Sequence, residues 1–314
     1  MKRGWIVALF AIIQLQMARP SVAQEADSGK VGAAVVNVDY SYAPVCPPST
    51  DSSLKAIMQR LNASRVGTLP IGARIVAAGK ELLGKPYLDK TLEVGEDMIV
   101  PVCNLEGFDC VTLFENAWAF GRLAKNGSSV RLGNLSAEIR TTRYRDGREN
   151  GFYSRLHYTT DYFYNNTQRG LLKEMTRTIG KKYAILETKP INFMTKHPNL
   201  YKQLKDDPAM VAKMDSIERM ISARGGFYYI KKENVEKIES GIQDGDLIGI
   251  TTSIPGIDIS HTGIAVKGDD GRIHFMNASS VFHKVIISKE PLADYLANNS
   301  KQTGIIVYRP IEQP

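Results

Sequence analysis

The sequence is poor in the features that mark several specialised classes of protein. It has 3 cysteines among 314 residues, too few for a disulfide framework, and they lack the short paired spacing of a zinc site. With 43% hydrophobic and 23% charged residues, the composition excludes a disordered chain and a coiled coil. A chain of this length suits one large domain or two modest ones.

The chain also lacks a large charge excess once its first residues are set apart. Lys2 and Arg3 precede an apolar run over residues 5–15, and Ser21-Val22-Ala23 has the small residues that a signal peptidase requires. We therefore expect residues 1–23 to be a secretory signal peptide. Without them the chain has 37 Lys and Arg against 33 Asp and Glu, so the formal net charge falls from +7 to +4.

Three further absences narrow the location and the partners. No stretch approaches the ~20 apolar residues of a membrane-spanning helix. The first cysteine, Cys46, lies far beyond the expected cleavage site, so no lipid anchor is expected there. Basic residues do not cluster with aromatic ones, which argues against nucleic-acid binding. We expect an exported protein, periplasmic or otherwise extracytoplasmic, without a stable membrane anchor; the oligomeric state stays open.

Helical patterns occupy the first part of the chain. Prolines break residues 24–53 into an irregular lead-in, after which helices are expected to begin near Ser53 and Pro70 and over residues 110–125. Residues from about 141 to 240 are polar, aromatic and helix-leaning. They predict a long, largely helical inserted lobe, with one helix over residues 201–224.

The C-terminal part changes to the patterns of strands. Short β-rich runs, separated mostly by turn signals, occupy residues 246–250, 261–266, 272–276, 283–287 and 304–308. This order predicts an α+β fold, in which helices pack on one face of an antiparallel sheet of about five strands. We expect residues 54–314 to form a single domain that includes the lobe.

Cys110 is the first candidate for a catalytic group. Asp109 is a suitable N-cap for the helix at 110–125, which places Cys110 in the first turn. The positive end of a helix lowers the pKa of a thiol there. Helical spacing puts Cys110, Leu113 and Phe114 on the apolar side, so the thiol should face the sheet. The alternative is that Cys110 is simply a small buried hydrophobe. Cys46 and Cys103 could pair in an oxidising compartment.

His261 is the strongest of the five histidines as a general base. It begins a strand in which the next residues on the same face, Gly263 and Ala265, are small enough to leave room beside it. The others suit structural or surface positions: His157, His197, His274 and His283. Their scatter, without ligand-pair spacing, also argues against a metal site, and no cofactor is expected.

Asn277 is the candidate that orients His261. If Asp269-Asp270-Gly271 is a three-residue hairpin loop with Gly271 left-handed, residue numbers paired across the two strands sum to 540. Asn277 then lies opposite Gly263, diagonal to His261 and on its face of the sheet. A four-residue loop would put Asn277 on the wrong face. Alone, Asn277 also suits a turn at the end of a strand.

These residues together resemble a known family. Cys110 precedes His261 by 151 positions and His261 precedes Asn277 by 16, close to the order and spacing of a papain-like Cys, His and Asn arrangement. The segments at 109–112, 260–263, 277–280 and 244–247 resemble NlpC-type papain-like cell-wall hydrolases. Arg155-Leu156-His157-Tyr158 is similar to a segment of the N-acetylmuramoyl-L-alanine amidase-like branch. The resemblance covers roughly residues 55–310.

The resemblance implies a papain-like core and hydrolysis of peptidoglycan fragments. Cys110 would attack the bond between N-acetylmuramic acid, including its anhydro form, and L-alanine, with His261 and Asn277 completing the triad. Substrate contacts are expected in the inserted lobe, at Tyr144, Arg155, His157, Tyr158 and Asp161. Val111-Thr112 replaces the Ser-Gly that commonly follows the nucleophile, which favours the amidase branch over the compact endopeptidases.

Two other functions remain open on the sequence. One is a γ-D-glutamyl endopeptidase of the same fold, which would cut within the stem peptide. The other is a noncatalytic protein that binds muropeptides. The products of muropeptide digestion separate all three.

Overall fold

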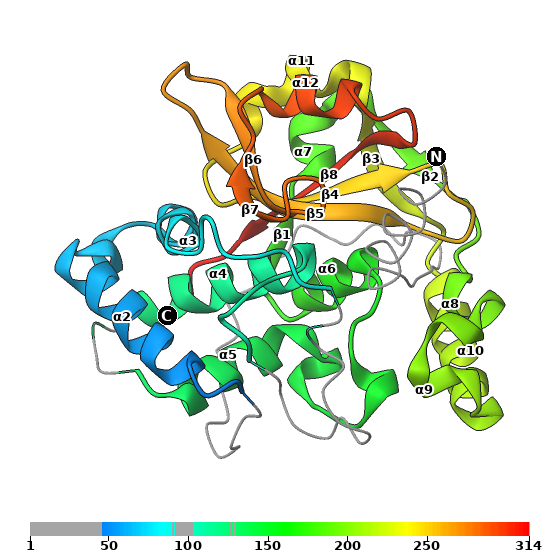
Figure 1. Cartoon of the computed structure of the whole chain (residues 1–314). Coiled ribbons are helices and arrows are strands. Elements are labelled where there is room, and N and C mark those ends of the chain that lie inside the picture. Colours follow the sequence, from blue (N-terminus) through cyan, green and yellow to red (C-terminus); the bar gives the residue numbers. More distant parts are fainter. Residues whose placement is uncertain (1–45, 90, 92–102, 126, 128–129, 314) are drawn as a thin grey trace, which may run out of the picture.

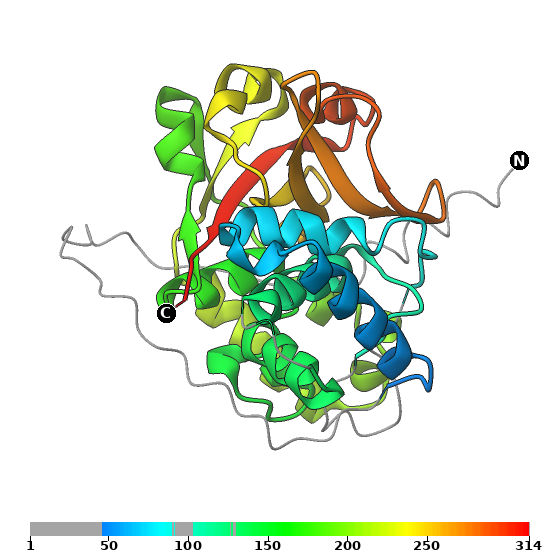
Figure 2. The same ribbon diagram turned by 90° about the vertical axis from the view of Figure 1, so that its left-hand side faces the viewer.

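An antiparallel sheet lies between two layers of helices (Figure 1, Figure 2). The computed structural model describes residues 46–89, 91, 103–125, 127 and 130–313. The expected signal peptide and most of the expected lead-in therefore lie outside the described residues. The predicted α+β class, with a helix beginning at Cys110 packed on an antiparallel sheet, is confirmed.

The five predicted C-terminal strands are all present. They are β4 (Leu247–Thr252), β5 (Ile259–Lys267), β6 (Ile273–Ser279), β7 (Lys284–Ile287) and β8 (Gln302–Pro310). Their order in the sheet is β8-β4-β5-β6-β7, with every pairing antiparallel. Hydrophobic side chains fill both faces, as expected for strands with helices on both sides.

The sheet is larger than predicted because the inserted segment supplies three more strands. These are β1 (Leu172–Glu174), β2 (Ala184–Glu187) and β3 (Phe227–Lys231). Both β1 and β3 pair with β8, and β2 continues the sheet beyond β3, which makes eight strands. The inserted segment is largely helical, as predicted, but the prediction missed these three short strands, which pair only with strands distant in sequence.

Helices cover both faces of the sheet, not one face as predicted. The lower layer in Figure 1 contains α3 (Ile71–Lys80), α4 (Cys110–Ala124) and α6 (Thr159–Gln168). The short helices α7 (Thr176–Gly180), α11 (Val235–Ile238) and α12 (Leu292–Ala297) cover the upper face. Below α4 lie α2 (Thr50–Ala63) and α5 (Leu132–Arg143). The nucleophile candidate thus begins a central helix, buried on several sides.

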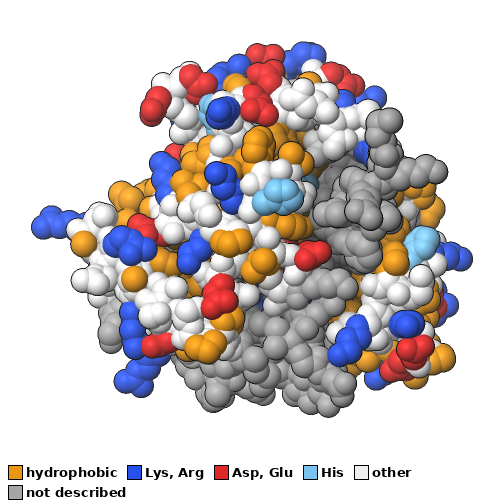
Figure 3. Space-filling model, viewed as in Figure 1, with side chains coloured by type: hydrophobic (Ala, Val, Ile, Leu, Met, Phe, Trp, Pro, Cys, Tyr) orange, Lys and Arg blue, Asp and Glu red, His pale blue; other side chains and the backbone are white. Residues whose placement is uncertain are grey.

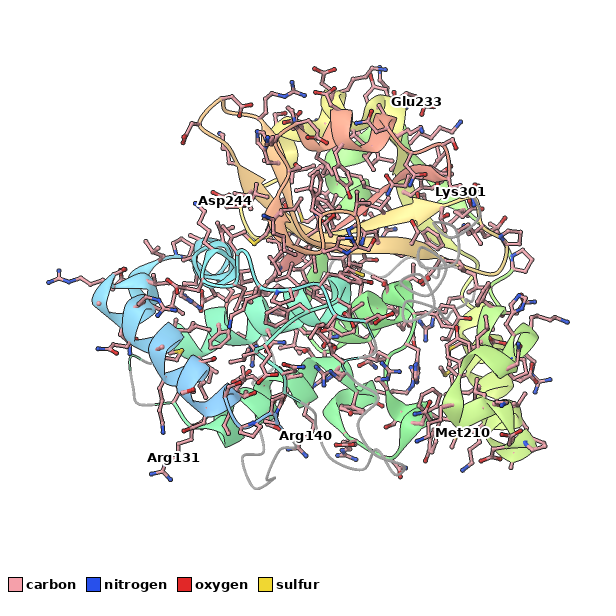
Figure 4. The ribbon with its side chains drawn as sticks, viewed as in Figure 1. Arg131, Arg140, Met210, Glu233, Asp244 and Lys301 are labelled. Carbon is pink, nitrogen blue, oxygen red and sulfur yellow. The ribbon has the colours of Figure 1, made fainter. Side chains whose placement is uncertain are left out.

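The predicted helix over residues 201–224 is divided. The segment forms α9 (Lys202–Lys205) and α10 (Pro208–Ser222). Asp207 caps α10 by accepting a hydrogen bond from the Met210 backbone N–H at 2.9 Å, and Pro208 follows it. A proline favours the first turn of a helix and disfavours its interior. With α8 (Phe193–Lys196), at the right of Figure 4 near the label of Met210, these helices pack in an apolar cluster that also includes Phe152, Tyr158 and Ile257.

Single 3₁₀ turns complete the described elements. They are η2 (Val66–Thr68), η3 (Arg145–Gly147), η4 (Phe152–Ser154), η5 (Lys181–Tyr183), η6 (Pro198–Leu200), η7 (Lys232–Asn234) and η8 (Glu239–Gly241). None of the helices in the described ranges combines the length and the apolar character needed to cross a membrane.

Two glycines let α3 approach the loop that enters β4. A Cβ at Gly72 would lie 2.2 Å from the Asp244 carbonyl oxygen, and one at Gly245 would lie 2.4 Å from the Gly72 Cα. Gly245 also has a φ of +79°, a left-handed value that favours glycine. Figure 4 shows Asp244 close above α3. The expected Asp244-Gly245 turn therefore also fixes the lower helical layer against the sheet.

Acidic and basic side chains are interspersed over the upper layer (Figure 3). This mixed surface agrees with the small net charge calculated for the chain without its first 23 residues. On this face the upper layer shows no broad field of one sign that would attract a polyanion.

Candidate active site

Asp109 fixes the start of α4. Its Oδ1 accepts hydrogen bonds from the backbone N–H groups of Val111 at 2.9 Å and Thr112 at 2.8 Å, and the Thr112 hydroxyl accepts from the Asp109 N–H at 3.0 Å. This is a capping box, in which two helix-terminal donors are satisfied reciprocally. The predicted cap is confirmed, and Cys110 is the first residue of the helix.

The start of α4 contacts β5 immediately after His261. Thr262 donates a hydrogen bond from its hydroxyl to the Cys110 carbonyl oxygen at 2.9 Å. The same threonine also contacts the Cys110 thiol through its hydroxyl and its backbone. The prediction that the thiol faces the sheet is therefore confirmed, and the contact residue is Thr262.

His261 and Asn277 form the predicted pair. The register of β5 and β6 follows the expected sum, with Ile264 opposite Met276, and Gly271 in the loop has a φ of +78°. The Asn277 amide donates to the Phe275 carbonyl oxygen at 3.2 Å, which identifies Nδ2. Its Oδ1 then accepts from His261 Nε2 at 3.0 Å. Because Nε2 carries the proton, Nδ1 keeps the lone pair that a general base needs.

A β-bulge places His261 at an irregular point of the sheet. Ile250 pairs with His261, but the next residue of β4, Thr251, pairs with Ile259, so Ser260 is the extra residue. Bulges of this kind redirect side chains and are frequent beside active sites. The His261 ring meets the edge of Phe275, with centroids 5.6 Å apart, and the side chain is partly exposed. The imidazole is thus held in place while remaining accessible.

Cys110 and His261 form no direct hydrogen bond with each other in the described residues. Thr262, which directly follows His261 on β5, contacts Cys110 and so connects the two residues. A second connection runs through Tyr295, whose pKa is raised to about 12 chiefly by burial and next by its proximity to Cys110. Tyr295 packs on Phe275, which contacts His261. Catalytic contacts in ligand-free sites are often loose and shorten when substrate binds.

Burial favours the neutral forms of the Cys110 thiol and the His261 imidazole. It raises the pKa of the Cys110 thiol to about 12, and the nearby Asp109 carboxylate acts in the same direction. The backbone N–H of Cys110 at the helix terminus does lower this pKa, as predicted, but desolvation outweighs it, so the net shift is upward. Burial also lowers the pKa of His261, against the smaller effect of its bond to Asn277. Both shifts favour the uncharged forms of the thiol and the imidazole.

Tyr87 is a member of the site that sequence reasoning missed. Residues 86–88 run beside Phe108, to which the Leu88 N–H donates at 3.0 Å. Burial raises the pKa of Tyr87, with further contributions from the charges of Cys110 and Asp109. Its hydroxyl is buried and has no hydrogen-bond partner among the described residues. No local pattern pointed to it, since its position 23 residues before Cys110 matters only through the contact with Phe108.

Two of the five expected substrate-binding residues, Arg155 and His157, line a narrow cavity beside the first turns of α4. The cavity is lined by Val111, Phe114, Glu115, Arg143, Arg155, Leu156, His157, Thr159 and Tyr162. Arg155 is buried there, and His157 is held by a hydrogen bond between Nε2 and the Phe152 carbonyl oxygen at 2.8 Å. Burial and the Arg155 charge lower the pKa of His157. Val111, which follows Cys110 in α4, lines this cavity, and Cys110 itself is not among the lining residues.

The other three residues make internal contacts. Tyr144 is buried and forms a β-bridge with Arg155. The Tyr158 hydroxyl donates to Glu218 Oε1 at 3.1 Å and accepts from the Phe193 N–H at 3.0 Å. Asp161 forms ion pairs with Arg145 at 2.5 Å and Arg224 at 2.6 Å. These contacts hold the inserted segment together, and the roles of all five residues in substrate binding stay predictions.

No metal site is evident in the described part of the chain. There, no group of three or more His, Cys, Asp or Glu side chains is arranged to hold an ion. The site combines a thiol at a helix terminus, an oriented imidazole and backbone N–H groups. Together these groups are suited to acyl transfer.

Comparisons with known proteins agree on one family. The model of the N-acetylmuramoyl-L-alanine amidase-like family matches residues 77–305. No curated protein matches the chain significantly.

Solved structures give the same result. The crystal structure of an N-acetylmuramoyl-L-alanine amidase from Bacteroides uniformis is 35% identical, with a TM-score of 0.70, over 77% of this chain and 99% of that one. A Bacteroides fragilis protein that bears the name xylanase is 34% identical, with a TM-score of 0.67, over 74% and 98%.

A Legionella pneumophila protein is 21% identical, with a TM-score of 0.61 over 83% of this chain and 96% of that one, and so shares the fold. The family match spans most of the chain, including Cys110, His261 and Asn277. The chain belongs to the N-acetylmuramoyl-L-alanine amidase-like family.

Proposed function

We propose that this chain is an exported cysteine amidase that hydrolyses the amide between N-acetylmuramic acid and L-alanine in peptidoglycan fragments. The observation that carries the proposal is the hydrogen bond between His261 Nε2 and Asn277 Oδ1, one residue from the contact of Thr262 with Cys110. Membership of the amidase-like family supports the substrate class.

The neutral pair sets the order of proton transfers. The Cys110 sulfur attacks the lactyl carbonyl carbon while its proton passes to His261 Nδ1. The tetrahedral intermediate then collapses, the C–N bond breaks, and the proton passes from His261 to the leaving amine of L-alanine. Water, deprotonated by the same nitrogen, hydrolyses the thioester and restores the thiol. Asn277 holds the tautomer that this sequence of steps needs.

Two donors suit the developing oxyanion. The backbone N–H of Cys110 lies in the first turn of α4, where helix N–H groups have no acceptor within the helix. We assign the second donor to Tyr87, because its hydroxyl is buried near Cys110 without a partner among the described residues. Such preorganised donors stabilise charge that appears only during the reaction.

The substrate is a small fragment in this proposal. The cavity beside Val111 has room for about one water molecule and is lined by Arg155 and by the Glu115–Arg143 ion pair, so a stem-peptide carboxylate would reach Arg155 only after the lining side chains move. Fragments that end in anhydro-N-acetylmuramic acid are included. Export depends on the expected signal peptide at residues 1–23 and would place the enzyme where such fragments form.

Digestion of defined muropeptides tests the proposal. The protein is incubated with disaccharide peptides carrying either the reducing or the anhydro sugar, and the products are separated and weighed by mass spectrometry. Release of an intact peptide that begins with L-alanine, together with the free disaccharide, is the expected result. A free L-Ala-γ-D-Glu dipeptide would identify a stem-peptide endopeptidase and overturn the amidase assignment.

Cysteine dependence needs its own variants. Cys110→Ala should abolish hydrolysis while binding of the muropeptide persists, and Cys110→Ser should retain little activity. His197→Ala is the matched control, because His197 is exposed and contacts Phe193 within the α8–α10 cluster, away from the site. Full activity of Cys110→Ala would refute the mechanism. Binding by the wild type without any hydrolysis would favour a noncatalytic binder.

A further inference from the structure

Residues 46–49, before α2, and residues 103–106, before α4, run side by side although they are far apart in the sequence. The Ser49 hydroxyl donates a hydrogen bond to Glu106 Oε1, across a separation of 57 positions. Three residues earlier on each segment, the side chains of Cys46 and Cys103 interact with each other across the same separation. The matching offset shows that residues 46–49 follow residues 103–106 in parallel, which brings the two thiols together.

Cys103 and Cys46 differ in how deeply they are buried. Cys103 is completely buried in an apolar cluster with Leu105 and Phe108, against the hydroxyl of Ser136. Cys46 is half-buried and packs on the same cluster from outside. The Cys46 thiol is therefore partly accessible to a reagent in solvent, and the Cys103 thiol is buried next to it.

From this arrangement we propose that Cys46 and Cys103 are a redox pair that forms a disulfide on contact with a disulfide oxidant. The Cys46 thiolate attacks one sulfur of the oxidant, forming a mixed disulfide and releasing the first thiolate. The Cys103 thiol then loses its proton and attacks the Cys46 sulfur, which expels the second thiolate. Two electrons pass to the oxidant, and two protons are released from the protein.

The ionisation of the two groups favours this order of attack. A hydrogen bond from Cys103 lowers the pKa of the Cys46 thiol, whereas that hydrogen bond and burial raise the pKa of Cys103. The more exposed cysteine is thus also the better nucleophile. Cys110 should not compete, because burial raises the pKa of its thiol to about 12 and so disfavours the thiolate.

The disulfide would support the nucleophile without touching substrate. Cys103 lies seven residues before Cys110, on the segment that leads into the capping residue Asp109. The bond would tie that segment to the start of α2 and close a loop of 57 positions, which restricts the unfolded chain far more than the folded one. The pairing does not depend on the proposed reaction. It uses only the proposed export, which would place the two cysteines in an oxidising compartment.

Disulfide mapping on the complete protein tests the pairing. The purified chain is equilibrated in buffers of reduced and oxidised glutathione, alkylated after acid quenching and unfolding, and digested without reductant for mass spectrometry. A peptide pair linking Cys46 to Cys103 should increase with oxidised glutathione, while Cys110 is recovered alkylated. Recovery of Cys46 and Cys103 as alkylated thiols in the most oxidising buffer would overturn the proposal, as would a dominant link to Cys110.

Thermal unfolding gives a second readout that does not require activity. The oxidised protein should unfold at least about 5 °C above the reduced protein. Cys46→Ser keeps the buried partner in place and should abolish this difference. An equal difference in the variant would show that another group is responsible and would overturn the pairing. A protein that forms the disulfide but does not cleave muropeptides would refute the proposed function alone.

Discussion

The two sides of α4 are buried by different means. Toward the sheet, Phe114 and Trp118 pack in an apolar cluster, and Thr262 supplies a neutral hydrogen bond. Toward α5, Glu115 forms an ion pair with Arg143, whose guanidinium donates at 2.7 and 2.9 Å, and both side chains are almost fully buried. One helix thus separates a neutral environment from a charged one.

This difference shows where proton transfer can take place. On the sheet side desolvation dominates, so Cys110 keeps its proton and His261 stays uncharged. On the α5 side Arg143 retains its charge because Glu115 faces it directly. Groups that must exchange a proton lie where neither charged form is favoured, and groups that must stay charged lie in pairs.

The largest expected effect comes from removing the base on the neutral side. His261→Ala should lower kcat by roughly 10²- to 10⁴-fold, because the variant loses the imidazole that accepts the Cys110 proton at neutral pH. Steady-state kinetics on a muropeptide measures this loss. His274→Ala is a matched control, since His274 lies on β6 and bonds Asp270 and the Ser288 carbonyl. Equal losses in both variants would mean that the effect is structural.

On the charged side of α4, a substitution should change the free energy of unfolding. Arg143→Met leaves the Glu115 carboxylate buried without its partner, which should cost about 3–5 kcal/mol of unfolding free energy. Urea denaturation measures the cost. The double variant with Glu115→Leu should lose less, because no unpaired charge remains. A double variant as unstable as the single one would show that the site depends on shape and not on charge pairing.

A smaller effect is expected at the residue that orients the base. Asn277→Ala should lower kcat by roughly 10- to 100-fold, because the imidazole loses the acceptor that fixes its tautomer and position. Asn277→Asp is the sharper test. Its carboxylate would stabilise the imidazolium and raise the pKa of His261, so activity should be lost at a higher pH than in the wild type. An unchanged pH profile would contradict the assigned bond.

The pH dependence of the wild type should show the smallest and most specific signature. Only neutral His261 can accept the thiol proton, and burial lowers its pKa below the ordinary value of 6.5. Activity should therefore be complete at pH 7 and be lost only as the pH falls well below 6.5. It should not fall again between pH 7 and 9, since the Cys110 thiol stays protonated there. A bell-shaped kcat/KM profile over this range would indicate a preformed thiolate–imidazolium pair.

The sequence was most informative where local chemistry determines geometry. Asp269-Asp270-Gly271 defines a hairpin with one favoured register, and that register alone is enough to put Asn277 beside His261. Asp109 likewise marks the start of a helix through its ability to cap one. In both cases a few adjacent residues are sufficient to determine the local geometry.

Local patterns failed where distant segments meet. The short strands β1 and β2 lack an alternating pattern and form only by pairing with other strands, although the aromatic run of β3 was a visible sign of strand preference. The raised pKa of Cys110 depends on burial by β5, which no helix pattern can show. The position of Tyr87 depends on the same kind of tertiary contact.

The inserted segment also covers one edge of strand β8. One edge of β8 pairs with β4, and the other is occupied at Gly304 and Ile305 by β3 and over residues 308–310 by β1. Removing the insert to imitate a compact endopeptidase would leave this backbone edge open to a second chain. Whatever it contributes to substrate choice, the insert also protects the protein from aggregation through that edge, and a shortened enzyme would need a replacement cover.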